Sequence, residues 1–316
     1  MKLAFLSRFQ NRFERGAENF VSELSKKLSK NHEVDVFSGR DADDMLQVIK
    51  GDYDIVVPIN GRLQSLKASL SRIFGRYKLL ISGHSGIGRD DIWNITVAKP
   101  DVFVALTDYS HKWAKKWAWG SKVVKIPNGV DVSRFSPNGE KIKLDLPRPI
   151  ILSVGALVWY KYHDRVIRAV GKIGEGSVLI VGQGPDKEKL EKLGSELLGN
   201  RFKIMNFKYE DMPKVYRSCD LFTLPSWSRE AFGIVYLEAL SCGLGVVAPD
   251  DQSRHEIIGD AGLFTCIDSP IDYAKAIKEA LSIEWSKKAT VQAKKFSWEK
   301  VAAAYEKVML EMRRSR

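Results

Sequence analysis

The stretch PSWSREAFGIVYLEALSCG, from Pro225 to Gly243, decides the fold, because a buried strand ends where it begins and a helix starts inside it. Residues 220–224, DLFTL, have the composition of a short buried strand. From Phe232 onwards, apolar residues recur at helical spacing, which predicts a helix. A strand followed directly by a helix is the unit from which parallel α/β sheets are built.

Two carboxylates flank the predicted start of this helix. Glu230 lies in the loop at the carboxyl end of the strand, and Glu238 lies inside the helix. Backbone amides near Phe232 and Gly233 would be unpaired donors at a helix N-terminus, which carries partial positive charge and suits a phosphate. A carboxylate accepts two hydrogen bonds from a vicinal diol, so both acids suit sugar hydroxyls. A phosphate site between two diol-binding acids indicates a sugar nucleotide as ligand.

The motif resembles the donor-binding signature of family-4 glycosyltransferases, in which two glutamates are separated by seven residues, with Phe-Gly between them and Cys-Gly after them. The resemblance covers nearly the whole chain. It implies an α/β fold of the GT-B type, with two Rossmann-like doubly wound domains facing across a cleft. Residues 1–145 would form an acceptor-side domain, and residues 146–316 a nucleotide-sugar-binding domain whose last helix, near 299–314, crosses back to the first.

The implied activity is transfer of a hexosyl group from a nucleotide-diphosphate sugar to an acceptor hydroxyl, with retained anomeric configuration and without a metal or a cofactor. The expected acceptor is lipid-linked or a cell-envelope glycan. Two other interpretations stay open: a membrane-docked nucleotide-sugar-binding protein that has lost catalysis, and a nucleotide-sugar epimerase or phosphorylase of the same architecture.

The resemblance also implies roles for single residues of the donor site. Glu238 would hold the ribose and Glu230 the transferred sugar, while Phe232 and Gly233 would meet the phosphates. Lys161 matches a lysine that clamps the donor diphosphate. The remaining positions are His84 near the sugar and the acceptor, Asn206 and Phe207 facing the base, and Gly16 facing the donor phosphates.

Two departures from the family pattern concern positive charge. Ala156 stands where the family has an arginine beside the donor diphosphate, and a guanidinium provides a bidentate phosphate contact that a lysine does not reproduce. Arg15 stands where the family has the first of two glycines. Arg229 and Arg15 are therefore candidate substitute cations.

Composition bounds the class of protein. A 316-residue chain with 44% hydrophobic residues suits two globular domains, and no apolar run approaches the roughly 18 residues of a membrane span. The N-terminal apolar run is too short for a signal peptide, and the three cysteines lack metal-ligand spacing, which favours the cytoplasm. The net charge of +11 favours anionic partners, although no nucleic-acid motif accompanies it, so no nucleic acid is expected as a partner.

Two stretches indicate an anionic membrane surface as a further partner. Residues 62–78 place five apolar side chains on one helical face among five basic ones, and residues 111–125 carry three tryptophans among lysines. A helix that packs on the core with a solvated basic face has the same pattern, so both interpretations stay open. The protein is expected to be cytoplasmic and peripheral to the membrane.

Two further patterns are read as ordinary structure. The D-x-D triplets at 41–43 and 52–54 precede a helix or strand instead of following a strand, so no metal site is expected there. Residues 246–248 are predicted to form a strand, and 250–256 the loop after it.

Overall fold

The computed structural model describes residues 1–10, 16–59 and 61–314 of the chain. Two compact units are present: the first comprises Met1–Gly129, Arg229–Phe232 and Trp298–Arg316, and the second comprises Val130–Ser228 and Gly233–Ser297. Each unit holds one six-stranded parallel sheet, which confirms two Rossmann-like α/β domains. The chain passes from the first unit to the second after Gly129, whereas the sequence pattern places that passage at 145.

The first sheet has the strand order β2-β1-β3-β4-β5-β6. Its inner strands are apolar nearly throughout, because helices cover both faces of a parallel sheet. The strands are β1 (Lys2–Leu6), β2 (Glu33–Phe37), β3 (Ile55–Pro58), β4 (Lys78–Ser82), β5 (Val102–Ala105) and β6 (Lys122–Lys125).

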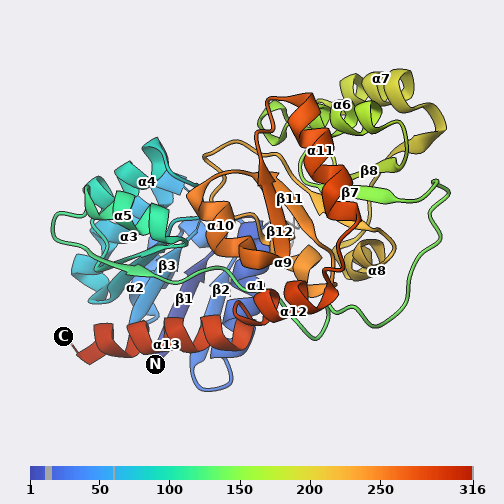
Figure 1. Ribbon diagram of the computed structural model, residues 1–316. Helices are drawn as coiled ribbons and strands as arrows, with labels where there is room; N and C mark the ends of the chain where they lie inside the picture. Colours follow the sequence, from blue (N-terminus) through green and yellow to red (C-terminus); the bar gives the residue numbers. More distant parts are fainter. Residues whose placement is uncertain (11–15, 60, 315–316) are drawn as a thin grey trace. The chain divides into compact units, whose positions relative to one another are not determined.

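Helices α1 (Gly16–Leu28) and α13 (Trp298–Arg314) cover one face of this sheet (Figure 1). The hydroxyls of Tyr305 and Ser82 form a buried hydrogen bond of 3.0 Å that joins α13 to the end of β4. The other face is covered by α2 (Met45–Lys50), α3 (Gly61–Gly75), α4 (Arg89–Trp93), the π-helical turn η2 (Asn94–Ala98) and α5 (Asp108–Lys115).

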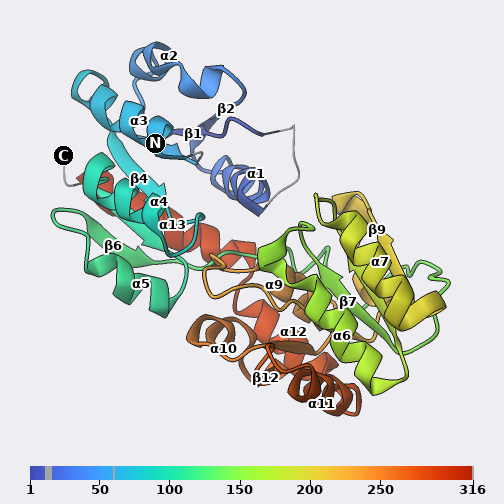
Figure 2. The same cartoon turned by 90° about the horizontal axis from the view of Figure 1, so that it is seen from above.

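The second sheet has the order β12-β11-β10-β7-β8-β9, so β10 and β7 are neighbours although 66 residues lie between the end of β7 and the start of β10. Helices α6, α7 and α11 cover one face (Figure 2), while α8, α9 and α12 lie on the other. The strands are β7 (Ile150–Val154), β8 (Ser177–Val181), β9 (Phe202–Met205), β10 (Leu221–Thr223), β11 (Val246–Pro249) and β12 (Gly262–Thr265). The helices are α6 (His163–Ile173), α7 (Lys187–Leu198), α8 (Met212–Arg217), α9 (Ile234–Ser241), α10 (Gln252–Ile258), α11 (Pro270–Leu281) and α12 (Ser286–Lys294).

The predicted loop over 250–256 is wrong, because the chain forms helix α10 there. The Asp251 side chain caps the helix by accepting a hydrogen bond from the Arg254 amide, 3.1 Å away. The buried face consists of Arg254, Ile257 and Ile258, which have helical spacing. Because one of these three buried positions is an arginine, the sequence does not show the helical spacing of apolar residues that would predict this helix.

Helix α9 begins at Ile234, two residues later than the sequence predicts. Its N-cap is Gly233, whose φ of 83° lies in the left-handed region that favours glycine. Phe232 is buried just ahead of the helix and is not part of it. The amides that the first turn leaves unpaired are therefore those that follow Phe232.

Candidate functional site

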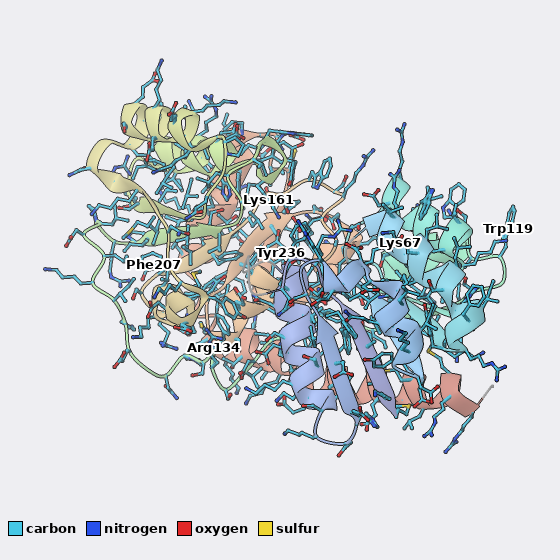
Figure 3. The ribbon with its side chains drawn as sticks, turned by 180° about the vertical axis from the view of Figure 1, so that it is seen from behind. Lys67, Trp119, Arg134, Lys161, Phe207 and Tyr236 are labelled. Carbon is cyan, nitrogen blue, oxygen red and sulfur yellow. The ribbon has the colours of Figure 1, made fainter. Side chains whose placement is uncertain are left out.

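Two loops of the second unit lie side by side at the carboxyl edge of its sheet, where parallel α/β sheets bind ligands. The loop after β7 carries Lys161, labelled in Figure 3, and the loop after β10 leads to Glu230. The Trp227 amide donates to the Tyr160 carbonyl over 3.0 Å, and the two rings stack with centroids 5.0 Å apart. The strand order thus joins residues that are about 70 positions apart in the sequence.

Arg254 holds the loop after β10 in place through hydrogen bonds to Ser226 and Trp227. Its side chain is 1% exposed, and Nη2 donates to the Ser226 carbonyl, the Ser226 hydroxyl and the Trp227 carbonyl at 3.1, 2.9 and 2.8 Å. Nη1 pairs with Asp251 Oδ2 at 2.7 Å. A guanidinium with five donors in a fixed geometry can satisfy several buried carbonyls at once. The backbone that leads to Glu230 is therefore held by a buried, charge-assisted network.

Glu238 lies inside α9 and is 4% exposed. The Tyr216 hydroxyl donates to Glu238 Oε2 over 2.7 Å. Burial raises the pKa of this carboxyl to about 7, against the hydrogen bonds from Tyr216 and Tyr209 and the charge of Arg134, which act to lower the pKa. Burial therefore favours the neutral form of the acid, and a ligand that donates hydrogen bonds to it favours the ionised form.

Arg134, which follows the PNGVD loop, belongs to the same buried group. Its guanidinium lies 4.3 Å from the centroid of the Tyr209 ring, and its Nη2 is buried without a hydrogen-bond partner in the described chain. A buried donor without a partner is costly, so this atom is available to a ligand. No local pattern in the sequence predicts that Arg134 and Tyr216 meet Glu238, or that Arg254 holds the loop after β10.

The loop after β7 contains Gly155, Ala156 and Lys161. Ala156 is exposed, Lys161 is half-buried, and a Cβ atom added at Gly155 would lie 3.7 Å from the Lys161 Cδ atom. His163, at the start of α6, is buried, and its Nδ1 lies 3.0 Å from the Ser153 hydroxyl. Burial, and secondarily the charge of Lys161, lowers the pKa of His163 to about 4, so the imidazole is neutral at physiological pH.

His84 lies in the loop after β4 of the first unit. Its ring centroid is 4.2 Å from that of Phe20, and its Nε2 is buried without a partner among the described residues. Burial lowers the pKa of His84 to about 4. In the same loop Gly86, at a φ of 79°, approaches the Arg229 carbonyl so closely that an added Cβ would lie 2.1 Å from the oxygen. Within the first unit, the loop of His84 and the residue before Glu230 are thus in backbone contact.

The structure places the remaining candidates as follows. Asn206 is exposed and Phe207 half-buried just beyond β9, and Phe207 is labelled in Figure 3. Arg229 is exposed, Glu230 is half-buried, and Gly16 is an exposed first residue of α1. Arg15 lies outside the described residues.

Within the second unit, Lys161 and the start of α9 provide positive charge and amide donors, which suit a phosphate, and Glu238 provides an acceptor for hydroxyl groups. Within the described chain, no three His, Cys, Asp or Glu side chains form a group that could hold a metal ion. In the D-x-D triplets, Asp43 pairs with Arg8 at 2.8 Å, and Asp54 accepts from the Lys2 amide at 2.9 Å.

Residues 136–296 match the family described as Glycosyl transferases group 1. A GDP-mannose-dependent monoacylated alpha-(1-6)-phosphatidylinositol monomannoside mannosyltransferase of Corynebacterium glutamicum is 29% identical over 181 residues, 51% of this chain and 47% of that protein. A D-inositol 3-phosphate glycosyltransferase of Corynebacterium jeikeium is 30% identical over 217 residues, 59% of this chain and 51% of that protein. The chain spans about half the length of these two curated relatives.

Solved structures resemble the whole chain. Anabaena HepE in complex with UDP has a TM-score of 0.81 at 18% identity, over 98% of this chain and 100% of that chain. A sucrose-phosphate synthase from Thermosynechococcus elongatus has a TM-score of 0.84 at 18% identity, over 100% of both chains. At this identity the likeness shows the fold alone, which is of the GT-B type.

Proposed function

Because this chain belongs to the Glycosyl transferases group 1 family, we propose that it transfers a hexosyl group from a nucleotide-diphosphate sugar to an acceptor hydroxyl. The transfer retains the anomeric configuration and uses neither a metal ion nor a cofactor. The acceptor is lipid-linked or a cell-envelope glycan, since relatives of this chain are named for phosphatidylinositol mannoside and inositol phosphate acceptors.

One observation carries the proposal: within the second unit, the loop of Lys161 contacts the loop after β10, whose chain continues through Glu230 to the helix that holds Glu238. The Trp227–Tyr160 hydrogen bond of 3.0 Å and the Arg254 network support both loops. A cation and an acid for a ribose therefore come from neighbouring segments of the second unit, and the backbone that leads to Glu230 is held there. Such preorganisation favours catalysis by positioning and by stabilisation of charge.

In the proposed reaction, the bond between the sugar anomeric carbon and the β-phosphate oxygen breaks, and its electron pair stays with the phosphate. The acceptor oxygen forms the new bond on the same face of the sugar, and its proton passes to the departing phosphate oxygen. Lys161 and the amides at the start of α9 stabilise the developing negative charge. Glu238 orients the ribose, Phe207 and Asn206 face the base, and Glu230 and His84 orient the sugar.

A donor screen followed by a transfer assay tests this function. GDP-mannose, UDP-glucose and other nucleotide-sugars are compared by thermal shift, because a ligand at 100 times its Kd stabilises the folded state by about 2.7 kcal/mol. The stabilising donor is then incubated with phosphoinositide and glycan acceptors, with and without EDTA, and the anomeric configuration of the product is determined by NMR. Nucleotide binding with neither transfer nor hydrolysis would favour a binding protein, and turnover of the donor without an acceptor would favour an epimerase.

We also propose that the α2–α5 layer of the first unit contacts an anionic membrane. Among the described residues, seven of the fifteen exposed large apolar side chains lie in this layer, and Trp117 and Trp119 follow directly after α5. On α3 the side chains Leu63, Leu70, Ile73 and Phe74 are 59–76% exposed. The face of α3 that packs on the sheet instead carries small and polar residues, such as Ala68 and Gln64. Lys67 and Trp119, labelled in Figure 3, add a basic charge and an 84%-exposed indole. Apolar side chains among basic ones suit anionic lipid headgroups. No helix in the described parts of the chain has the length and apolarity of a membrane span.

A further inference from the structure

A pocket of about 260 Å³ lies in the second unit next to the turn that carries Lys161. Its walls come from that turn, from the first residues of α6 and from the start of α7. The volume is below the roughly 300–1,000 Å³ of pockets that enclose drug-sized ligands, so it suits a single ring better than a nucleotide. None of the residues assigned above to donor binding lines it.

One wall of the pocket is the indole of Trp159, which is 62% exposed yet held in place. Its ring is nearly perpendicular to the rings of Tyr160 and Trp227, with both centroid distances at 5.5 Å. Those two rings stack on one another, and the Trp227 carbonyl is fixed by Arg254 at 2.8 Å. The rings of Tyr160 and Trp227 therefore hold the Trp159 side chain in one orientation before a ligand binds, and such preorganisation lowers the entropic cost of binding.

The aromatic wall is suited to a pyranose. One side of a pyranose ring presents several C–H groups with partial positive charge, and the face of an aromatic ring carries partial negative charge. Tyr162 adds a second aromatic group to the pocket lining, and its centroid lies 6.4 Å from that of Trp159. Its backbone has a φ of 52°, which is unusual for a residue with a side chain and marks a conformation enforced by the surroundings.

The charged side chains of the pocket are balanced. Asp164 and Asp186 face Arg165 and Lys189 among the lining residues, so the pocket has no net charge. Arg165 is moreover paired with Asp268 at 2.6 Å and lies 3.8 Å from the centroid of the Tyr162 ring. A balanced set of donors and acceptors disfavours a phosphate or an ammonium group and matches a neutral ligand with many hydroxyls.

His163 adds a buried polar side chain to the lining. Its Nδ1 lies 3.0 Å from the Ser153 hydroxyl, and the backbone at Ala156 and Gly155 forms hydrogen bonds with the ring. The imidazole is therefore held in place next to the turn that carries Trp159.

We propose that this pocket binds a neutral hexopyranose unit, which is a sugar of the acceptor glycan beyond the hydroxyl that reacts. Its assignment to the acceptor rests on the proposed function, whereas the binding of a sugar ring does not. The pocket would make the protein favour acceptors that already carry a hexose near the reacting position.

Ligand-observed NMR with methyl α-D-mannopyranoside and methyl α-D-glucopyranoside tests the binding without requiring turnover. We expect saturable binding of at least one glycoside by the wild type, about tenfold weaker binding by Trp159→Ala, and partial recovery in Trp159→Phe. Trp119→Ala is the matched control, because it removes an 84%-exposed indole from the other unit and should leave glycoside binding unchanged. Absence of saturable binding by the wild type, or equal binding by Trp159→Ala, overturns the proposal.

Two measurements separate this site from the donor site. Nucleotide-diphosphate affinity should be the same in Trp159→Ala and in the wild type, which also shows that the variant is folded. In a transfer assay the variant should raise the acceptor KM about tenfold for acceptors that carry a hexose, with the donor KM unchanged. If Trp159→Ala lowered binding to anionic vesicles and not to glycosides, the tryptophan would belong to a lipid surface and the sugar pocket would be rejected. Failure of all nucleotide-sugars to bind would remove the proposed function and leave the glycoside result standing.

Discussion

At the scale of single residues, the balance of charge around the leaving diphosphate decides whether the chain is an efficient enzyme. The family resemblance implies an arginine beside the donor diphosphate where this chain has Ala156, and Lys161 remains in the same loop. The exposed side chain of Ala156 leaves room for a larger residue. The neutral state of His163, caused by burial, keeps a second positive charge away from this loop at physiological pH.

We expect Ala156→Arg to raise the rate of transfer, because one preorganised donor at developing charge is worth about 10²–10³ in rate. Lys161→Ala should reduce transfer by a similar factor. Initial rates with the donor found in the screen measure both effects. If Ala156→Arg folds and transfers no faster, another group already stabilises the charge of the leaving diphosphate. Arg229→Ala should then lower the rate of transfer.

The carboxyl of Glu238 should make nucleotide affinity depend on pH. Its pKa in the free protein is raised to about 7 by burial, and hydroxyl groups of a ligand favour the ionised form, so binding releases a proton at lower pH. Affinity should therefore fall up to about tenfold per pH unit below 7. Calorimetry in buffers of different ionisation enthalpy measures the proton release.

The variant Glu238→Gln isolates the contribution of the Glu238 carboxyl to the pH dependence of nucleotide affinity. Titration of the nucleotide phosphate affects the wild type and the variant equally, so it cancels in the comparison. The variant should bind more weakly at pH 8 and should lose the additional pH dependence. Equal slopes for the variant and the wild type between pH 6 and 8 would remove Glu238 from the ligand site.

At the scale of elements, α3 is turned so that its apolar side chains face outward. The sheet side of the helix carries Gln64, Ser65, Ala68 and Gly75, which are buried. The Gln64 side chain donates a hydrogen bond to the Ala42 carbonyl over 3.0 Å, and its Oε1 accepts one from the Ile59 amide at 3.2 Å. These two hydrogen bonds offset the free-energy cost of burying a polar side chain. This orientation contradicts the interpretation of residues 62–78 as a helix with an apolar face on the core.

Replacement of Ile73 and Phe74 by serine should weaken binding to vesicles that contain anionic lipid by about 10- to 100-fold, because each side chain contributes apolar surface to the interface. Folding should be unaffected, since both side chains are more than 70% exposed. Co-sedimentation with vesicles of phosphatidylglycerol and phosphatidylcholine measures the partition.

Val291→Ser is the matched control, because Val291 is a 55%-exposed apolar residue of α12 in the other unit. Lys67→Glu should weaken binding at low salt and have less effect at high salt. Equal partition of the double serine variant and the wild type would contradict a membrane role for α3.

At the scale of the whole molecule, buried ionisable groups in both units shape the dependence of stability on pH. His84 and His163 have a pKa of about 4 in the folded protein, against 6.5 ordinarily, because burial disfavours their charged forms. The unfolded chain therefore binds more protons between pH 6.5 and 4, and their contribution to stability falls as pH drops through that window. Asp91 and Glu238, with pKa values raised to about 7 by burial, act in the opposite direction.

His163→Asn separates one of these contributions. Asparagine keeps a hydrogen-bonding group near Ser153 and does not titrate. The substitution should therefore lower the free energy of unfolding by the same amount at every pH, apart from removing the contribution of His163 to its pH dependence. Between pH 7.5 and 5 the wild type should lose about 2 kcal/mol more than the variant. Urea unfolding at a series of pH values measures the difference, and parallel curves would show that His163 is not buried as a neutral group.

The sequence by itself determined the alternation of strands and helices, the two parallel sheets and the spacing of Glu230 and Glu238 around the start of a helix, because these depend on local periodicity and on short spacings along the chain. The tertiary structure decided which side chains meet. The neighbouring positions of β7 and β10 brought Tyr160 against Trp227, and α10 brought Arg254 beneath them. Neither the Tyr216–Glu238 hydrogen bond nor the outward turn of α3 has a local signature, because each depends on contacts between segments that are distant in the sequence. Periodicity shows that a helix has two faces, and only packing decides which of them is covered.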